Sequence, residues 1–566
     1  MKMNKISLIF FVGLLLMFTS CDLDYFPSDA MTPDQLKSDP GGALYATDGN
    51  YAMFKDRLAY RGESSGYSGN SYVRHYFQMA EFPSDNITLA GRTSDPLYEA
   101  TTYKRDAALR NVTYMWWVAY RIINGANSVI ESVQDGVSVE SDHLKGENYF
   151  IRAIAHLNLS TLYSRPYSHG RENLGVVLRT STDAVETSRA TVGEVYDQIE
   201  ADLLDAIRLM DKGTRRGNAG YASKAAAQGL LSRVYLYMEK NEEVIKVVDE
   251  MLAGADPMSK LETTQNLPNY FANALTSHET LWAVAHTEIE SRGTSSIASM
   301  YLSDGVGWGE VYSSDPLNDL YEKYPNDVRY SSFIWPQYVP DSDKYMVRWP
   351  VKSAADDFYE NAIQNVTFDS SQQKFFFKDS DINNGNAVWI EEEIVNGHTQ
   401  NYIMLGGSKQ RVRLTREMYE RASWPKYFVK KFSYQDDNPM LSSPVMLRWG
   451  EVILNRAEAY AKTNKRDAAI ADVNVLRARA GLSGNELFST SNMMGYTDIL
   501  DVVLDERRLE LSFEGHRMHD LYRNKKSMDR RFAGAQPWEI INYDNNKIVY
   551  FIPLDEITVS NITQNP

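Results

Sequence analysis

The sequence predicts a mainly α-helical protein with paired helices, as in tetratricopeptide repeats, and an inserted loop-rich, aromatic-rich region. Apolar residues recur at three- to four-residue spacing in the first half of the chain and again near its end. Between these parts, short segments broken by Gly, Pro, Asp and Ser hold six of the ten tryptophans. We therefore expect one domain over 34–566, with a helical scaffold in 34–254 and 443–526, the insertion in 255–442, and a C-terminal segment in 527–566.

The first twenty residues are typical of a secretory leader. A basic start is followed by an apolar run from Ile6 to Phe18. This run is too short for a permanent transmembrane helix, which needs about 20 apolar residues. Cys21, the only cysteine, follows directly, and the Phe18-Thr19-Ser20-Cys21 junction resembles a bacterial lipobox. We expect cleavage before Cys21 and acylation of that residue, which with more than one chain gives stable anchoring. The alternative is an ordinary cleaved signal with an incidental cysteine.

The residues after Cys21 and the overall charge bear on the partners of the chain. Residues 21–33 are acidic, contain two prolines and lack helical periodicity, so they read as a tether leading away from a membrane. The formal net charge of the whole chain is −16. Such a surface repels phosphate backbones, so we expect no nucleic-acid ligand.

The helical patterns appear in order along the chain. Residues 115–133 and 146–167 are long and amphipathic, with a polar turn between them, which predicts a helical hairpin. Thr191 is a plausible N-cap with Glu194 three residues later, so the next helix should begin there. Small residues such as Gly229 mark a further helix that a neighbour can approach closely. The later helical segments are 448–462, 466–482 and 498–526. No clean 34-residue period is visible, so the repeat is degenerate.

The segment 498–526 contains a regular series of charges. Glu506, Glu510 and Glu514 recur every four residues and are interleaved with arginines, which predicts a partly buried salt-bridge ladder. His516, His519 and Asp520 have spacing that could contribute to a metal site. No second helix supplies an evident His or Cys partner, so we expect neither a metal nor another cofactor. No feature of the sequence supports a structural calcium ion.

The sequence contains none of the common catalytic signatures. There is no G-x-S-x-G, H-E-x-x-H, Walker A or dinucleotide-binding motif, and acylation would occupy the only cysteine. Two carboxylates suited to glycoside hydrolysis cannot be recognised in a chain with 75 acidic residues, because their separation is a three-dimensional property. A surface hydrolase therefore stays an alternative to a binding protein.

Ordered matches over nearly the whole mature chain resemble the SusD/RagB family of surface glycan-binding lipoproteins of Bacteroidetes. The matching residues are Trp117, Tyr120, Ile123, Ala126 and Asn127; Arg152, Ala153 and His156; Glu451, Leu454, Ala457 and Glu458; Arg479, Ala480 and Gly481; Glu506, Arg507 and Arg508; Phe513–Arg517; and Gln564–Pro566. This resemblance implies a SusD-like fold and a non-catalytic protein. It also implies that ligand-contacting aromatics come from two regions brought together on one face.

Two segments combine aromatic rings with hydrogen-bonding side chains, as a glycan site requires. The first is a polar stretch that we expect to be irregular, and the second contains the tryptophans that we favour as platforms. The candidate residues are Tyr72, Arg74, Tyr76, Asn86 and Arg92 in the first segment and Trp308, Tyr312 and Trp335 in the second. For any single aromatic residue, packing in the core is the competing interpretation.

The resemblance implies a cell-surface lipoprotein of the outer membrane that captures oligosaccharide and passes it to a SusC-like TonB-dependent transporter. An alternative within the same fold is a RagB-like lid that imports peptides. A pure scaffold that associates with the transporter and binds no soluble ligand is a further alternative. The sequence does not distinguish the ligand.

Overall fold

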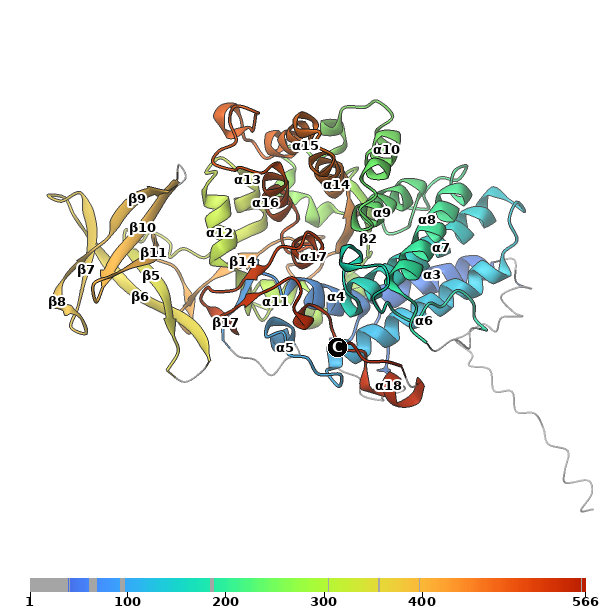
Figure 1. Ribbon diagram of the computed structural model, residues 1–566, viewed down its shortest axis with the longest axis horizontal. Coiled ribbons are helices and arrows are strands. Elements are labelled where there is room, and N and C mark those ends of the chain that lie inside the picture. The colour runs from blue at the N-terminus through green and yellow to red at the C-terminus, as the bar shows by residue number, and fades with distance from the viewer. Residues whose placement is uncertain are drawn as a thin grey trace, which may run out of the picture.

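The computed structural model describes most of the chain after the predicted tether. The described residues are 39, 41–60, 69–91, 97–183, 188–303, 305–354, 357–395, 398–560 and 562–566. The predicted leader, Cys21, the tether and Arg92 lie outside them. Figure 1 shows a helical body with a β-sheet projecting from one end. No helix in the described part combines the length and apolar character needed to cross a membrane.

The first helical group confirms the predicted hairpin and cap. The helices are α3 (Gly42–Lys55), α6 (Arg110–Ser132), α7 (Val139–Tyr163), α8 (Val192–Leu209), α9 (Lys224–Tyr237) and α10 (Asn241–Leu252). Helices α6 and α7 pack against each other and α7 packs on α8 (Figure 1). Thr191 caps α8 through a capping box with Glu194. The Thr191 side chain accepts a hydrogen bond from the Glu194 backbone N–H, and the Glu194 side chain accepts one from the Thr191 backbone N–H.

The second helical group completes the scaffold from the C-terminal part of the chain. It comprises α14 (Trp449–Lys462), α15 (Arg466–Arg479), α16 (Ile499–Leu511) and α17 (Arg517–Arg523). Helix α14 packs on both α9 and α10, which joins the two groups. A Cβ atom on Gly229 of α9 would lie 2.8 Å from Leu281 and 3.2 Å from Leu447, so a larger residue would force these elements apart. The predicted close approach at this glycine is confirmed.

The inserted region contains more strand than the sequence suggested. Its main sheet has the strand order β8-β7-β6-β5-β11-β10-β9, all antiparallel, and β17 (Gly534–Pro537) pairs with β6. The strands are β5 (Tyr345–Lys352), β6 (Phe358–Asp369), β7 (Lys374–Asp379), β8 (Ile382–Trp389), β9 (Glu391–Val395), β10 (His398–Leu405) and β11 (Ser408–Arg416). Strand β8 also contacts β10, so the sheet curls. It encloses its own apolar cluster, which includes Trp349 and Phe377.

Ion pairs fasten this sheet to the helical body at α12 (Asp315–Glu322). Arg348 of β5 pairs with Asp315, and the Arg411 guanidinium of β11 lies 2.7 Å from Asp319. Arg413 also pairs with Asp319. Three arginines on two adjacent strands thus meet one short helix. The sheet projects outward, but its base is held on both of these strands.

Short two-stranded sheets connect segments that are far apart in the sequence. Strand β1 (Ile87–Leu89) pairs with β3 (Val311–Ser313), and β4 (Ile334–Pro336) pairs with β14 (Tyr427–Val429). Strand β2 (Thr280–Ala283) pairs with β15 (Val445–Arg448), and β16 (Met528–Asp529) with β18 (Ile540–Ile541). Further short α-helices and strands are α5 (Leu97–Thr101), α11 (Ala298–Tyr301), α13 (Val328–Phe333), β12 (Glu420–Arg421), β13 (Trp424–Pro425) and α18 (Leu554–Ser560).

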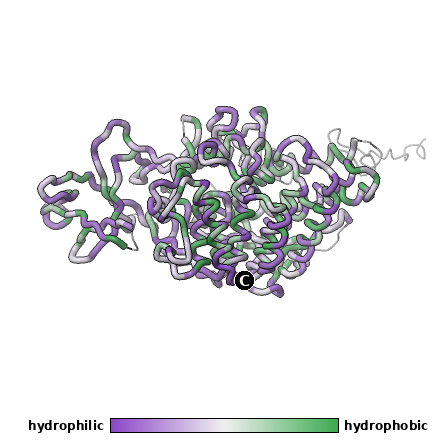
Figure 2. Tube along the Cα trace, turned by 90° about the horizontal axis from the view of Figure 1, so that it is seen from above, coloured by the Kyte–Doolittle hydropathy of each residue, from purple (hydrophilic) through white to green (hydrophobic). Residues whose placement is uncertain are grey.

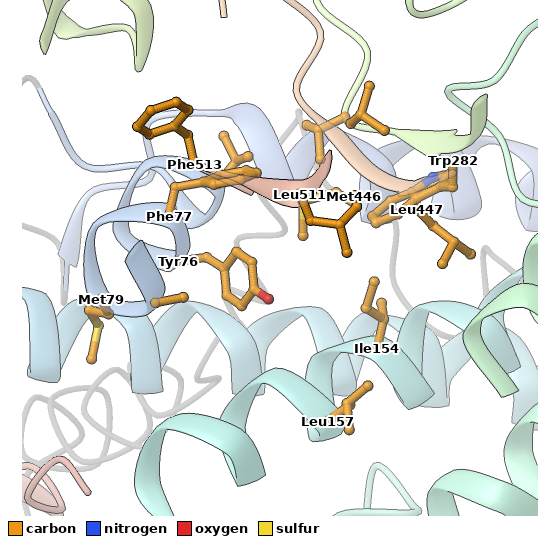
Figure 3. Close-up of a cluster of buried hydrophobic side chains, with 14 of the residues drawn as sticks. Tyr76, Phe77, Met79, Ile154, Leu157, Trp282, Met446, Leu447, Leu511 and Phe513 are labelled. Carbon is orange, nitrogen blue, oxygen red and sulfur yellow. The ribbon is translucent and has the colours of Figure 1, made fainter. Parts of the chain in front are cut away.

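One large apolar cluster runs through the helical body and includes residues of the insertion. Figure 3 shows Trp282, Met446 and Leu447 of β2 and β15 above Ile154 of α7, with Tyr76 beside them. Figure 2 shows hydrophobic stretches concentrated in this body, while the projecting sheet carries many hydrophilic ones. The insertion is therefore not a separate unit, because its first strands contribute to the common core.

The predicted salt-bridge ladder exists, although its geometry differs from the expectation. Helix α16 ends at Leu511, so Glu514 lies beyond the helix and not on its face. The partners also come from other elements. Arg448 contacts Glu510 at 2.6 Å and Glu279 at 2.9 Å, and Arg329 contacts Glu510 at 3.0 Å. Arg479 of α15 also pairs with Glu510. The interleaved Arg507 and Arg508 instead bind Asp520 and Asp85.

These groups are almost completely buried, which sets their protonation states. Burial by itself raises the pKa of a carboxyl group, but Arg448 and Lys431 lower the pKa of the Glu514 carboxyl to about 2. Three guanidinium groups hold the pKa of Glu510 well below its usual range. Both carboxylates are therefore ionised at neutral pH. Each stays buried only because cations surround it.

Replacing Glu510 with Gln should destabilise the fold strongly, because three buried guanidinium groups lose the charge that compensates them. We expect Glu510→Gln to lower the free energy of unfolding by about 3–5 kcal/mol. Denaturant unfolding followed by circular dichroism measures this change.

Glu242→Gln is the matched control, since it makes the same substitution in the exposed pair with Lys465, whose Nζ lies 2.7 Å from the carboxylate. Exposed pairs contribute less than about 1 kcal/mol. Equal effects of the two substitutions would contradict the structural role of the buried cluster.

Candidate functional site

Trp308 lies in the loop between α11 and β3 and is the one exposed tryptophan of this protein. All ten tryptophans are among the described residues, and the other nine are buried or half-buried. Trp308 is 58% exposed. A large aromatic side chain that stays open to solvent in a protein with such an extensive core is a candidate for ligand contact.

The exposed ring is nevertheless held in place. Its Nε1–H donates to the Thr294 carbonyl at 2.9 Å, and its backbone N–H donates to the Ser299 carbonyl at 2.6 Å. The Arg421 guanidinium donates to the Trp308 carbonyl at 2.9 Å and to Glu310 at 3.0 Å. Because the ring edge and the main chain are both fixed, a ligand would meet a preorganised surface.

Glycines flanking Trp308 allow this loop conformation. A Cβ atom on Gly307 would lie 1.9 Å from the Leu302 carbonyl oxygen, which no side chain tolerates. Gly309 adopts a φ of +52°, a backbone conformation that residues with a side chain rarely adopt. A Cβ atom on Gly309 would also lie 3.0 Å from the Phe428 ring. The G-V-G-W-G sequence is therefore needed to present the indole.

Phe428 brings the other predicted residues of the second segment together. Trp335 of β4 is half-buried with its ring centroid 6.4 Å from that of Phe428, and Lys430 lies 5.1 Å from the Trp335 ring. The Tyr312 ring centroid lies 5.9 Å from that of Phe428, but Tyr312 is fully buried. Trp335 can therefore contribute part of its ring to a surface, whereas Tyr312 supports that surface from below.

One further aromatic residue and one arginine belong to this region and were missed in the sequence. Tyr419 is 50% exposed. The Tyr419 N–H donates to the Gln337 carbonyl, so Tyr419 lies beside the extended segment that follows Trp335. We call Trp308, Trp335, Tyr419 and Arg421 the aromatic surface. The mixture of an aromatic residue and an arginine at 419–421 was the signal that could have identified them.

The aromatic surface combines rings with hydrogen-bonding groups. Tyr419, which is 50% exposed, carries a hydroxyl that can donate or accept a hydrogen bond. The Arg421 guanidinium is half-exposed beside Trp308. Rings for apolar C–H faces and polar groups for hydroxyls are the two requirements of saccharide binding.

The first predicted segment is a buried helix and not an irregular stretch. Helix α4 (Tyr72–Glu81) is buried at every position. The Tyr72 hydroxyl accepts a hydrogen bond from Asn158, and its ring packs on Phe54 at 4.8 Å. Tyr76 lies within the core cluster that Figure 3 shows. Neither tyrosine presents a face to a ligand in this conformation.

The polar candidates of this segment that the structure describes, Arg74 and Asn86, are also buried. Arg74 is 5% exposed. Asn86 is fully buried, donates to Glu81 at 2.9 Å and accepts from Arg508 at 2.8 Å. Its side chain is thus used within the protein. Arg92 lies outside the described residues.

The two segments do meet in space, as the family resemblance implied. Strand β1 pairs with β3, with Thr88 opposite Tyr312. This pairing places the end of the first segment beside the strand that follows the Trp308 loop. The first segment therefore forms the support of the aromatic surface and not the surface itself.

The histidines considered as metal ligands are engaged in packing. Burial lowers the pKa of His516 to about 4, and Asp520 contacts Arg507 at 2.8 Å and Arg523 at 2.6 Å. Among the described residues, no three His, Cys, Asp or Glu side chains converge as metal ligands would. Asp520 thus compensates the charges of Arg507 and Arg523.

Comparison with known protein families gives two matches. The family model described as the SusD family matches residues 279–562. A second model, described as starch-binding associating with outer membrane, matches residues 70–236. A relative, SusD-like protein P38 of Formosa agariphila, is 20% identical over 477 residues, which are 81% of each chain.

Solved structures share the fold. A SusD superfamily protein of Bacteroides thetaiotaomicron is 22% identical, covers 95% of this chain and 100% of its own, and has a TM-score of 0.68. A SusD superfamily protein of Bacteroides vulgatus has a TM-score of 0.64 at 21% identity, with 93% and 98% coverage. A laminarin-binding SusD-like protein has a TM-score of 0.56 at 19% identity, with the same coverage. Because the SusD model spans half of the chain, the protein belongs to the SusD family.

Proposed function

We propose that this protein captures saccharides at the aromatic surface. The observation that carries the proposal is the Trp308 indole, which is 58% exposed and yet fixed by a hydrogen bond from its own ring nitrogen. An exposed ring that is already ordered loses little conformational entropy when a sugar stacks on it. Such a ring is therefore useful for binding and has no role in stabilising the core.

The neighbouring groups and the relatives support this ligand class. Arg421 and Tyr419 supply hydrogen-bonding groups near Trp308, and Trp335 extends the apolar part. One matching family model is named for starch binding, and one similar structure is described as binding laminarin. Both names concern neutral glucans, so glucans are the first ligands to test.

We further propose that the captured saccharide passes to a SusC-like TonB-dependent transporter. The family resemblance and the description of one family model as associating with the outer membrane support this partner and place. Acylation at Cys21 would keep the binding domain at the outer surface beside the transporter. Delivery requires no chemistry on the ligand, in agreement with a binding protein.

Removing the Trp308 ring should weaken saccharide binding without unfolding the protein. We expect Trp308→Ala to reduce affinity by about tenfold or more, equivalent to about 1.4 kcal/mol of lost stacking. Affinity electrophoresis in gels containing laminarin, starch or other polysaccharides measures the retardation. The thermal unfolding midpoint should be unchanged because the side chain is largely outside the core.

Trp389→Ala is the control, since this half-buried tryptophan lies on β8 of the projecting sheet, away from the aromatic surface. Equal retardation of the parent and Trp308→Ala proteins would refute the site. Binding of oligopeptides in native mass spectrometry, with no glycan retarding the protein, would favour the RagB-like peptide lid. Release of reducing ends would show a hydrolase.

The lipid anchor gives an independent prediction. Cys21→Ser should abolish incorporation of labelled palmitate and move the protein from the outer-membrane fraction to a soluble one, because acylation requires the thiol. Immunoblots of fractionated cells measure the distribution. Saccharide affinity should not change. Membrane retention of the unlabelled variant would contradict anchoring through Cys21.

A further inference from the structure

A pocket of about 540 Å³ lies between α6, residues 177–182 and α18. This volume is within the range of about 300–1,000 Å³ that is typical of small-molecule sites. Its lining shares no residue with the aromatic surface. The three walls come from segments that are far apart in the sequence.

The wall formed by residues 177–182 is held firmly against the helices. The Tyr120 hydroxyl donates to the Val177 carbonyl at 2.7 Å. Arg152 donates to the Thr180 carbonyl at 3.0 Å and also pairs with Asp202 at 2.6 Å, and both of these charged side chains are buried. This wall is therefore fixed by the helical core.

Hydrogen bonds to distant segments also hold the third wall. The Leu554 N–H of α18 donates to the Ala107 carbonyl at 3.0 Å, and the Tyr60 hydroxyl donates to Asp555 at 2.8 Å. Beyond the helix, Asn565 donates to the Tyr163 carbonyl at 2.9 Å. Hydrogen bonds thus hold both the wall formed by residues 177–182 and the wall formed by α18. The pocket is therefore formed before any ligand arrives, and binding needs little ordering of the protein.

The lining combines an aromatic side with side chains that have unused hydrogen-bonding capacity. Trp117 is half-buried, and the Arg121 guanidinium lies 5.1 Å from the centre of its ring. Among the described residues, the Asn124 side chain makes no hydrogen bond and Arg121 makes no ion pair, although both are exposed at the pocket. A ligand with hydroxyl groups can use these donors and acceptors.

The charges around the pocket balance. Arg121 and Arg179 contribute two positive charges, and Glu556 contributes one negative charge. The second negative charge comes from Glu131, which accepts hydrogen bonds from both the N–H and the hydroxyl of Thr182 in the wall. A formal balance of two and two gives no net attraction for an anion or a cation, so a neutral ligand is favoured.

We infer that this pocket is a second binding site, which takes a neutral saccharide independently of the aromatic surface. An aromatic side, an adjacent amide and guanidinium rim, balanced charge and pinned walls all fit a hydroxyl-rich, uncharged ring system. Trp117 and Tyr120 supply the apolar contact, and Asn124 and Arg121 supply the hydrogen bonds. The inference does not depend on ligand capture at Trp308.

The test compares two variants of the full mature protein. Asn124→Trp fills the pocket from an exposed helical position, and Trp308→Ala removes the other site. Saturation-transfer NMR with a panel of neutral disaccharides and matching uronic-acid disaccharides detects binding. We expect at least one neutral disaccharide to give a signal that persists in Trp308→Ala and is lost in Asn124→Trp. Arg121→Ala should weaken that binding by about tenfold, whereas Arg466→Ala, at the exposed first residue of α15, should not.

The remaining outcomes overturn the inference. A signal that persists in a folded Asn124→Trp variant, as judged by circular dichroism, would place the ligand elsewhere. Loss of all binding in Trp308→Ala would show that the aromatic surface is the one site. Binding of uronic-acid disaccharides alone would refute the neutral ligand class. If Asn124→Trp does not fold, Arg121→Ala becomes the test. An unchanged affinity of the Arg121→Ala variant would then refute the site.

Discussion

The packing of the whole body depends on one buried carboxylate, Glu510, and the arginines that surround it. Arg329 comes from the insertion, Arg448 precedes α14 and Arg479 ends α15, so three separate parts of the chain meet at one residue of α16. Burying any of these charges alone would cost several kcal/mol. The parts can therefore assemble at low free energy only when all of them are present, which ties the insertion to the second helical group.

This constraint extends to the aromatic surface through a short piece of chain. Lys431 binds Glu514 at 2.7 Å, and it follows β14 by two residues. Strand β14 pairs with β4, which carries Trp335, and its Phe428 ring contacts the glycine next to Trp308. The exposed ring thus takes its position from the buried ionic cluster. A ligand surface at the edge of a long loop can be rigid because its base is part of the core.

The sequence identified the features that depend on local spacing and missed those that depend on distant partners. The α6–α7 hairpin, the cap at Thr191 and the charges at Glu506 and Glu510 follow from periodicity, and the structure contains all of them. Helix α4 was missed because its polar residues suggest an exposed stretch, whereas Asn86, Glu81 and Arg508 satisfy one another in the interior. No sequence pattern reveals that a polar group will find its partner four hundred residues away. For the same reason Tyr72 and Tyr76 could not be distinguished from exposed platforms.

Trp308 and Trp117 illustrate two ways of keeping an aromatic ring available in a protein that buries most of its tryptophans. Trp308 is held through its ring nitrogen and main chain on a loop whose conformation requires glycine at positions 307 and 309. Trp117 is held on a helix between Tyr60 and Tyr114, and the solvent-exposed Arg121 lies over its ring. Both arrangements fix the ring before a ligand binds, so neither needs a conformational change. Selectivity would then come from the groups beside each ring: a half-exposed guanidinium and one tyrosine at the first, and a charge-balanced amide and guanidinium rim at the second.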